Sequence, residues 1–175
     1  MKKLIMLAVA LAFSQPAQAC QCAFPPLDTQ SVREAKNVFV FRLLDARLQT
    51  EGSALPLTAT VLGNIEIVDT IRGTADAKRI RYSVHQCCGT RLDVGKYYLA
   101  LSSDSGPEIH GHSGNLIEAG EMYYPGSGTR ERIETVLSGE EGLENAFSAY
   151  ALDRTQQIPR PPPPNCPGSG APTTP

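Results

Sequence analysis

Two pairs of closely spaced cysteines constrain the fold of this chain more than any other feature of its sequence. Cys20 and Cys22 stand near the amino terminus, and Cys87 and Cys88 follow about 65 residues later. A disulfide within either pair would close a very small, strained ring. A disulfide between the pairs closes a long loop, which is worth on the order of 4 kcal/mol in the chain-entropy model. We therefore expect two links between the pairs, and the sequence leaves both connectivities open.

The first 19 residues have the pattern of a secretory signal peptide. Two lysines precede the apolar stretch Leu4–Phe13, which is too short to span a bilayer, and Ala17-Gln18-Ala19 supplies the small residues of a cleavage site. We expect cleavage directly before Cys20 and an extracellular or periplasmic location. Such compartments are oxidising, and disulfides are the default state of cysteines there.

Length and charge exclude several classes of function. Removing residues 1–19 from the 175 leaves 156, enough for one domain with appendages. Without Lys2 and Lys3, 14 basic residues face 18 acidic ones, a net charge of −4. A mildly acidic chain attracts neither nucleic acid nor anionic lipid. No stretch after the signal is long and apolar enough to form a transmembrane segment, so we expect neither kind of partner.

Apolar periodicity predicts strands through the first two thirds of the chain and helices after them. A capping box formed by Ser31 and Glu34 indicates a short helix that runs through Ala35. Glycine and aspartate mark a turn at Asp93-Val94-Gly95, and Gly63-Asn64 is typical of a bulge or a bend. The expected strands are Val38–Leu44, Leu57–Ile71, Arg79–Val84, Tyr97–Leu101 and one or two more within Glu108–Glu118; the expected later helices are Thr129–Leu137 and Glu141–Leu152.

These elements favour a mainly β fold, a closed five-stranded barrel of the OB type with the helices at about 129–153 packed against it. A β-sandwich has a similar strand count and is the alternative. The domain is expected to span residues 20–157, and the proline-rich residues 158–175 to form a disordered tail. Cys166 lies in that tail without a partner, and is therefore available for a disulfide-linked dimer.

The expected mature amino terminus has a specific chemistry. The α-amine and the carbonyl oxygen of Cys20 together form a five-membered chelate, and a catalytic zinc ion keeps one coordination position open. The unperturbed pKa of an α-amine, about 7.7–8.0, leaves part of it neutral and able to bind metal. Disulfides on both sides of Gln21 would pre-organise this wedge and lower the entropic cost of binding.

The order of these motifs resembles that of a known family. The matching features are the start Cys20-Gln21-Cys22-Ala23 with a proline-rich segment after it, the strand Asn37–Arg42, the segment Ile65–Gly73, and Cys88-Gly89 followed by Gly95-Lys96-Tyr97-Tyr98-Leu99. They are similar to the N-terminal, netrin-like domain of the tissue inhibitors of metalloproteinases. The resemblance covers about half of the chain, from Cys20 to Ser103.

The resemblance implies an OB-fold barrel, a disulfide from Cys20 to Cys88, and inhibition of zinc metalloendopeptidases by chelation through Cys20. It also implies that the side chain of Gln21 enters the specificity pocket of the protease, where the family usually has Thr or Ser. The chain lacks the cysteine that follows the early helix in the family, and also the cysteine-rich C-terminal subdomain. On this resemblance, Cys87 would substitute for the missing cysteine as the partner of Cys22. Taken together, these features predict a secreted, non-enzymatic inhibitor that needs no cofactor.

Two alternatives to inhibition also start from the amino terminus. A netrin-like domain can serve as an extracellular or envelope interaction module without any protease target. Bacterial lipoproteins are cleaved before a cysteine that is then acylated, and acylation of Cys20 would block the amine. Ala17 and Gln18 fit that cleavage pattern poorly.

A further candidate is the motif His110-Gly111-His112. Residues i and i+2 of a strand point to the same side, so the two imidazoles are placed to share a metal ion, with His85 as a third candidate ligand. The alternative is a polar loop with two surface histidines. The cysteine spacing does not match a thioredoxin-like Cys-X-X-Cys motif, and the sequence has no nucleophile elbow, His-Glu-X-X-His motif or phosphate loop.

Overall fold

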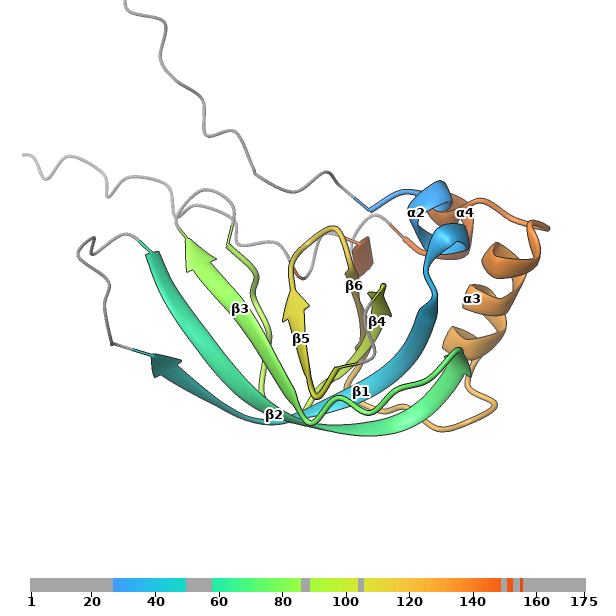
Figure 1. Cartoon of the computed structure of the whole chain (residues 1–175). Coiled ribbons are helices and arrows are strands. Elements are labelled where there is room, and N and C mark those ends of the chain that lie inside the picture. Colours follow the sequence, from blue (N-terminus) through green and yellow to red (C-terminus); the bar gives the residue numbers. More distant parts are fainter. Residues whose placement is uncertain are drawn as a thin grey trace, which may run out of the picture.

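The structure, a computed structural model, describes residues 27–49, 58–85, 89–103, 106–148, 151–152 and 155. It is mainly β, with one six-stranded sheet and short helices gathered at one end of that sheet (Figure 1). The elements are α2 (Thr29–Glu34), β1 (Asn37–Gln49), β2 (Thr58–Arg72), β3 (Arg79–His85), β4 (Tyr97–Ser102), β5 (Glu108–Gly111), β6 (Leu116–Gly120), α3 (Gly128–Ser138) and α4 (Leu143–Ala146).

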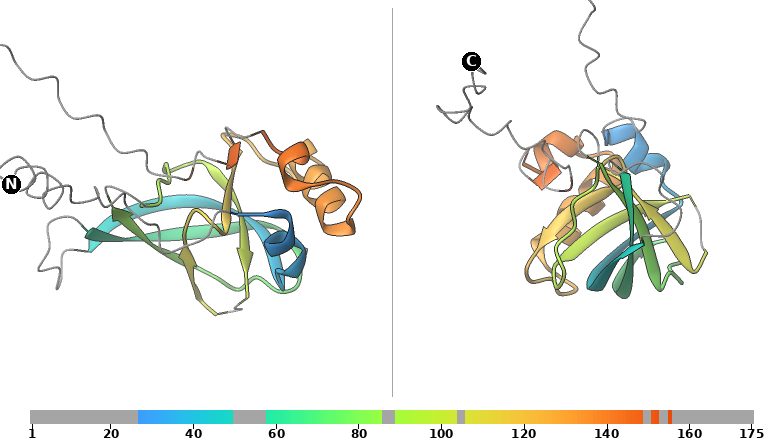
Figure 2. Two further views of the ribbon diagram at one scale, coloured as in Figure 1. Left: turned by 90° about the horizontal axis from the view of Figure 1, so that it is seen from above. Right: turned by 90° about the vertical axis from the view of Figure 1, so that its left-hand side faces the viewer.

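The sheet is mixed and has the strand order β5-β3-β2-β1-β4-β6. All neighbouring strands are antiparallel except β3 and β5, which run parallel. The sheet curls strongly, as the end-on view in Figure 2 shows, and the turn 112–115 joins its two edge strands, β5 and β6. It is nevertheless not closed into a barrel, because β5 pairs with β3 and β6 pairs with β4. The expected closed five-stranded barrel is therefore not confirmed.

Strand β1 has buried side chains on both faces, and it divides the interior into two cores. Phe39, Phe41 and Leu43 point into the inner core, inside the curl of the sheet. Val38 and Val40 point to the other face and into an outer core shared with the helices. The continuous apolar run at the start of β1 is therefore the sequence signature of a strand that is covered on both sides.

The long β1–β2 hairpin contains a bulge close to the predicted position. The sequence predicts it at Gly63-Asn64 in β2. The extra residue lies instead in the facing strand β1, where the register shifts between Leu43 and Asp45. Leu44 is thereby turned outward and is 46% exposed. Gly63 has a different function, because a Cβ there would lie 2.6 Å from Leu43 Cδ1 and 2.9 Å from Asp45 O. The glycine thus permits close contact between the two strands.

The helices follow the predicted pattern with two corrections. The expected helix Thr129–Leu137 is present as α3, and Gly139 ends it in the left-handed conformation. The amino-terminal cap of α2 is Asp28, which accepts from Ser31 N at 2.7 Å, so the predicted capping box at Ser31 is wrong. The expected helix Glu141–Leu152 is interrupted, because Phe147 is extended and packs in the outer core.

The last described residue, Thr155, ties the carboxy-terminal segment to the sheet. It is fully buried, its carbonyl accepts from Arg91 N at 2.8 Å, and its hydroxyl donates to Leu116 O at 3.3 Å. The expected domain end at residue 157 and the tail 158–175, with Cys166, lie outside the described residues. Among the residues described, no helix is long and apolar enough to cross a membrane.

Candidate functional site

The predicted binding wedge lies outside the part of the chain that the structure describes. This applies to Cys20, Gln21, Cys22 and Ala23, and equally to Cys87 and Cys88. The disulfides between the two cysteine pairs and the chelating amine therefore remain predictions. The structure does describe the segments from which both cysteine pairs extend, namely α2 and the end of β3.

Helix α2 is fixed to the carboxy-terminal helices at its first residue. Thr29 Oγ1 accepts from the backbone N of Leu143 at 2.9 Å and donates to Glu144 Oε2 at 3.2 Å. Leu143 opens α4, where backbone N–H groups have no partner within the helix. We call α2 and the contacts that anchor it the amino-terminal junction of the domain. One threonine therefore connects this junction to a helix more than 100 residues away in the sequence.

Two arginines strengthen the same junction by capping helix carboxy termini. Arg33 Nε donates to Val136 O at 3.1 Å, in the last turn of α3. Arg72, at the end of β2, donates to Arg33 O at 2.8 Å and to Ala35 O at 3.4 Å. Arg33 adds a second donor to Val136 O, which also accepts from Gly139 N at 3.2 Å, and both arginines place a cation at the negative end of a helix dipole. With Val32 fully buried in the outer core, α2 is held by contacts with β2, α3 and α4.

The second cysteine pair lies between two residues that are hydrogen-bonded to each other. Thr90 N donates to Ser83 O at 2.8 Å, so the chain returns to β3 directly after residues 86–88. In Figure 1 the carboxy-terminal end of β3 lies at the upper left and α2 at the upper right.

The predicted metal motif does not assemble into a metal site among the described residues. His110 is exposed at the end of β5, and His112 lies in the following turn. The Nδ1 atom of His112 accepts from Gly114 N at 3.1 Å, which occupies the lone pair that a metal would need there. Burial, with a smaller effect of the His110 charge, lowers the pKa of His112. No cluster of three or more ligating side chains occurs in the part described, and the side chain of His85 lies outside it.

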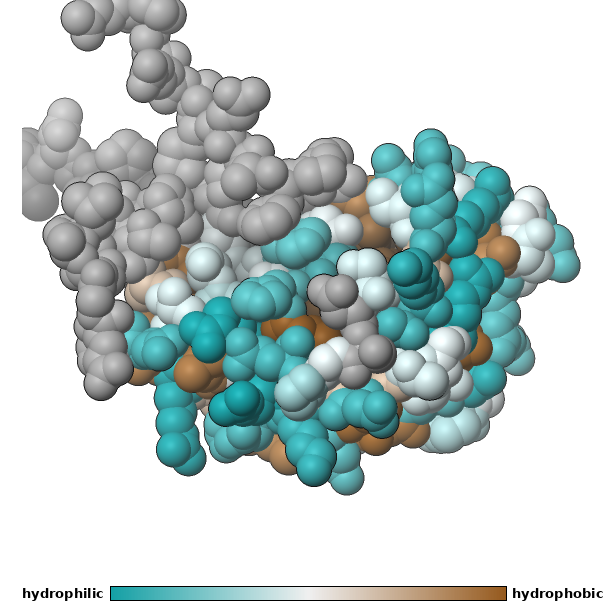
Figure 3. All heavy atoms as spheres, viewed as in Figure 1, coloured by the Kyte–Doolittle hydropathy of each residue, from teal (hydrophilic) through white to brown (hydrophobic). Residues whose placement is uncertain are grey.

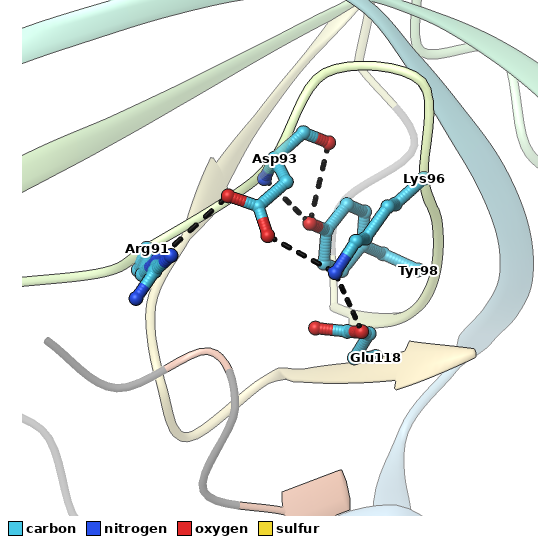
Figure 4. Close-up of polar contacts among 5 residues, drawn as sticks. All are labelled: Arg91, Asp93, Lys96, Tyr98 and Glu118. Atoms are coloured by element: carbon cyan, nitrogen blue, oxygen red, sulfur yellow. Dashed lines mark hydrogen bonds and ion pairs between the residues drawn. The ribbon is translucent and has the colours of Figure 1, made fainter. Parts of the chain in front are cut away.

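A polar cluster that the sequence did not indicate closes the turn before β4 (Figure 4). Lys96 Nζ lies 3.1 Å from Asp93 Oδ2 and 3.1 Å from Glu118 Oε1. Tyr98 accepts from Asp93 N at 2.6 Å through its hydroxyl. Burial alone would lower the pKa of Lys96, but its hydrogen bonds to both carboxylates outweigh burial and raise that pKa. The Gly-X-X-Tyr-Leu pattern thus contains residues that fix a turn, and this arrangement indicates a structural role.

A second cluster fastens α3 to the sheet. Arg130 Nη1 contacts Asp69 Oδ1 at 2.6 Å, and Tyr123 donates to Asp69 Oδ2 at 2.5 Å. Burial, followed by the hydrogen bond to Asp69, raises the pKa of Tyr123. No local pattern predicts this cluster, because Asp69 lies more than 50 residues from both Tyr123 and Arg130 in the sequence.

The geometry therefore gives a firmly anchored amino-terminal junction on a curled β scaffold. Comparison with known proteins adds no family: the chain matches no protein-family model and no curated protein sequence.

Proposed function

We propose that this protein is an exported, non-enzymatic inhibitor of zinc metalloendopeptidases, whose mature amino terminus, Cys20-Gln21-Cys22, binds the catalytic metal ion. The observation that carries the proposal is the anchored junction at α2. The contacts of Thr29, Arg33 and Arg72 fix the point from which the amino-terminal segment extends. A rigid starting point lowers the entropic cost of placing a short segment in an active site.

The chemistry of the wedge follows from its two donor atoms. The neutral α-amine and the carbonyl oxygen of Cys20 would take the coordination position that a catalytic zinc ion keeps for water. The Gln21 side chain would enter the adjoining pocket, and its length and amide favour a roomy or polar one. Disulfides from Cys20 and Cys22 to the Cys87-Cys88 pair would hold the wedge in its binding conformation.

The proposal includes the finer fold assignment, a netrin-like domain of the OB type. A curled, mainly β sheet with helices at one end supports it, although the sheet has six strands and its edge strands β5 and β6 do not pair with each other. The surface is also compatible with recognition by the amino terminus. On the face seen in Figure 3, hydrophilic side chains cover most of the described surface and apolar ones form small, separate patches.

The sharpest test adds one alanine before Cys20 in the mature protein. The extra residue displaces the α-amine from the metal and alters none of the described residues, so we expect the fold and its melting temperature to be unchanged. We expect the unmodified protein to inhibit at least one zinc endopeptidase in a broad panel, and the extended protein to lose that inhibition.

Two outcomes would contradict the proposal. Inhibition that survives the added alanine would exclude chelation by the amine. Absence of inhibition by the unmodified protein across the panel would favour the alternative function, an extracellular or envelope interaction module. Gln21→Thr is the matched control for pocket recognition: it keeps the chelate and should change which proteases are inhibited.

A further inference from the structure

A small pocket on the outer surface of β3 and β5 is lined by polar side chains that the proposed function does not use. It measures about 120 Å³ and is lined by Thr60, Arg81, Ser83, Thr90, His110 and His112, together with Tyr82 and Gly111. The sheet register explains why these residues meet, because Ser83 lies opposite Thr60 and Arg81 lies opposite His110. Three strands therefore contribute side chains to one hollow.

The hydroxyl groups of this pocket have unused hydrogen-bonding capacity. The side chains of Thr60, Ser83 and Thr90 make no hydrogen bond with any residue of the described part of the chain. Thr90 is the most informative, because it lines the pocket although only 3% of the residue is exposed. Among the described residues, the buried side-chain polar atom without a partner is Ser127 Oγ, so the Thr90 hydroxyl is not sealed off from the pocket and can bond to a water molecule or a ligand there.

Arg81 gives the pocket a fixed cation. Its Nε lies 2.8 Å from Glu108 Oε1, and its Nη1 donates to Gln49 Oε1 at 3.1 Å. These two contacts orient the guanidinium, which has five N–H donors, and leave further donors for a ligand. Glu108 is the acidic group beside it, and Arg79 also contacts that carboxylate at 3.6 Å. Two arginines thus stand against one carboxylate, and His110 and His112 carry no negative charge. The charged groups around the pocket therefore have an excess of positive charge.

We propose that this pocket binds a small oxyanion, a phosphate, sulfate or carboxylate group, through the guanidinium of Arg81 and the hydroxyls of Thr90 and Ser83. The donor set selects this ligand class: an arginine fork and hydroxyls match the oxygens of an anion. It disfavours a metal cation, because the described lining contains no carboxylate and His112 Nδ1 already accepts a hydrogen bond. The proposal is independent of the amino-terminal wedge.

Titration of the full mature protein with inorganic phosphate, followed by backbone amide NMR shifts, tests the site. We expect saturable shifts centred on Thr60, Ser83, Thr90 and Gly111. Thr90→Val keeps the shape of the side chain and should weaken binding about threefold to tenfold, the effect of one neutral hydrogen bond. Arg81→Met should abolish saturable binding, and Thr70→Val, an exposed threonine farther along β2, should leave it unchanged.

A parallel titration with acetate separates the two kinds of oxyanion. Tighter binding of phosphate indicates a tetrahedral ligand, tighter binding of acetate indicates a carboxylate, and both support the proposal if Thr90→Val weakens them. Shifts that do not saturate, that spread over exposed Lys and Arg residues, or that Thr90→Val leaves unchanged would overturn it. Thr90→Val also keeps the test valid if Arg81→Met fails to fold.

Discussion

The inner and outer cores share strand β1, but they are assembled from different parts of the chain. The inner core takes its side chains from strands and short loops between residues 39 and 116. The outer core adds Val32 near the amino terminus and residues up to Phe147. The inner core is thus a property of the curled sheet, whereas the outer core forms only when three short helices dock together.

The helices of the outer core are too short to be stable alone. Helix α2 has six residues and α4 has four, while isolated helices below about 12–15 residues are marginal in water. Polar contacts accordingly concentrate there, with Arg33, Thr29 and the Asp69–Arg130 pair linking the helices to one another or to the sheet. This comparison indicates that the sheet provides the scaffold and that side-chain contacts set the position of the amino-terminal junction.

The largest expected effect is in the inner core. Phe41 is fully buried, and its ring lies 5.7 Å from that of Tyr98. Phe41→Ala should lower the free energy of unfolding by about 3–5 kcal/mol, because it leaves a cavity between strands. Leu48→Ala, at a 60% exposed position of the same strand, is the control and should change it by less than about 0.5 kcal/mol. Denaturant unfolding measures both, and equal effects would contradict the assignment of the inner core.

A substitution in the outer core should separate the two cores. Ile133→Ala in α3 removes a fully buried side chain and should cost about 2–5 kcal/mol. Native-state amide exchange should then accelerate more in α3 than in β2 and β3, because the inner core does not include Ile133. Uniform acceleration would show that the two cores unfold as one unit.

The glycine that follows β2 should be less replaceable than a glycine in an open turn. Gly73 has φ +72°, and a Cβ there would collide with Asn37 Oδ1 and Lys36 O. Gly73→Ala should therefore cost about 2–4 kcal/mol, from strain and overpacking together. Gly95 has φ +91°, and no heavy atom beyond its own chain neighbours lies within 4 Å of the position that a Cβ would take, so Gly95→Ala should cost only about 1–2 kcal/mol. Thermal unfolding of both variants gives the comparison, and the reverse order would contradict it.

Sequence patterns predicted the strands well, because alternation and β-branched residues are local signals. They predicted α3 from its apolar spacing and from Gly139. They failed for sheet closure, because the parallel pairing of β5 with β3 depends on residues far apart in the sequence. For the same reason they missed Thr29, Arg33 and Lys96, whose partners are known only once the chain has folded. The one local signal was the basic residue with glycine that ends β2, Arg72-Gly73.

The junction itself should respond to a smaller change. Thr29→Val leaves the backbone N of the buried Leu143 without its partner and should lower stability by about 1–2 kcal/mol. Gln30→Ala, which removes only an exposed hydrogen bond to Glu34 in the same helix, is the control and should have almost no effect. If the junction supports the wedge, Thr29→Val should also weaken protease inhibition while the sheet remains folded. Equal behaviour of the two variants would contradict anchoring through Thr29.

The smallest expected effect is a pH dependence in the turn between β5 and β6. The folded pKa of His112 lies below its ordinary value of 6.5, chiefly because the ring is buried. The unfolded chain therefore takes up a proton on His112 at a higher pH than the folded protein does. The contribution of the neutral His112 ring to the free energy of unfolding is fully present above about pH 6.5 and is lost as the pH falls through the lowered pKa. His112→Gln should flatten the stability profile in that window. Hydrogen bonding to Arg81 lowers the pKa of Glu108 below its ordinary value of 4.5. The effect of Glu108 on stability therefore falls at lower pH than that of His112, and the two can be told apart.

The most direct test of the central claim is the intact mass and amino-terminal residue of the exported protein. The account predicts a chain that starts at Cys20 with an unmodified α-amine. It also predicts a mass four hydrogen atoms below that of the reduced chain, because Cys20, Cys22, Cys87 and Cys88 form two disulfides. An acyl group on Cys20, a start at any other residue, or free thiols at Cys87 and Cys88 would contradict it.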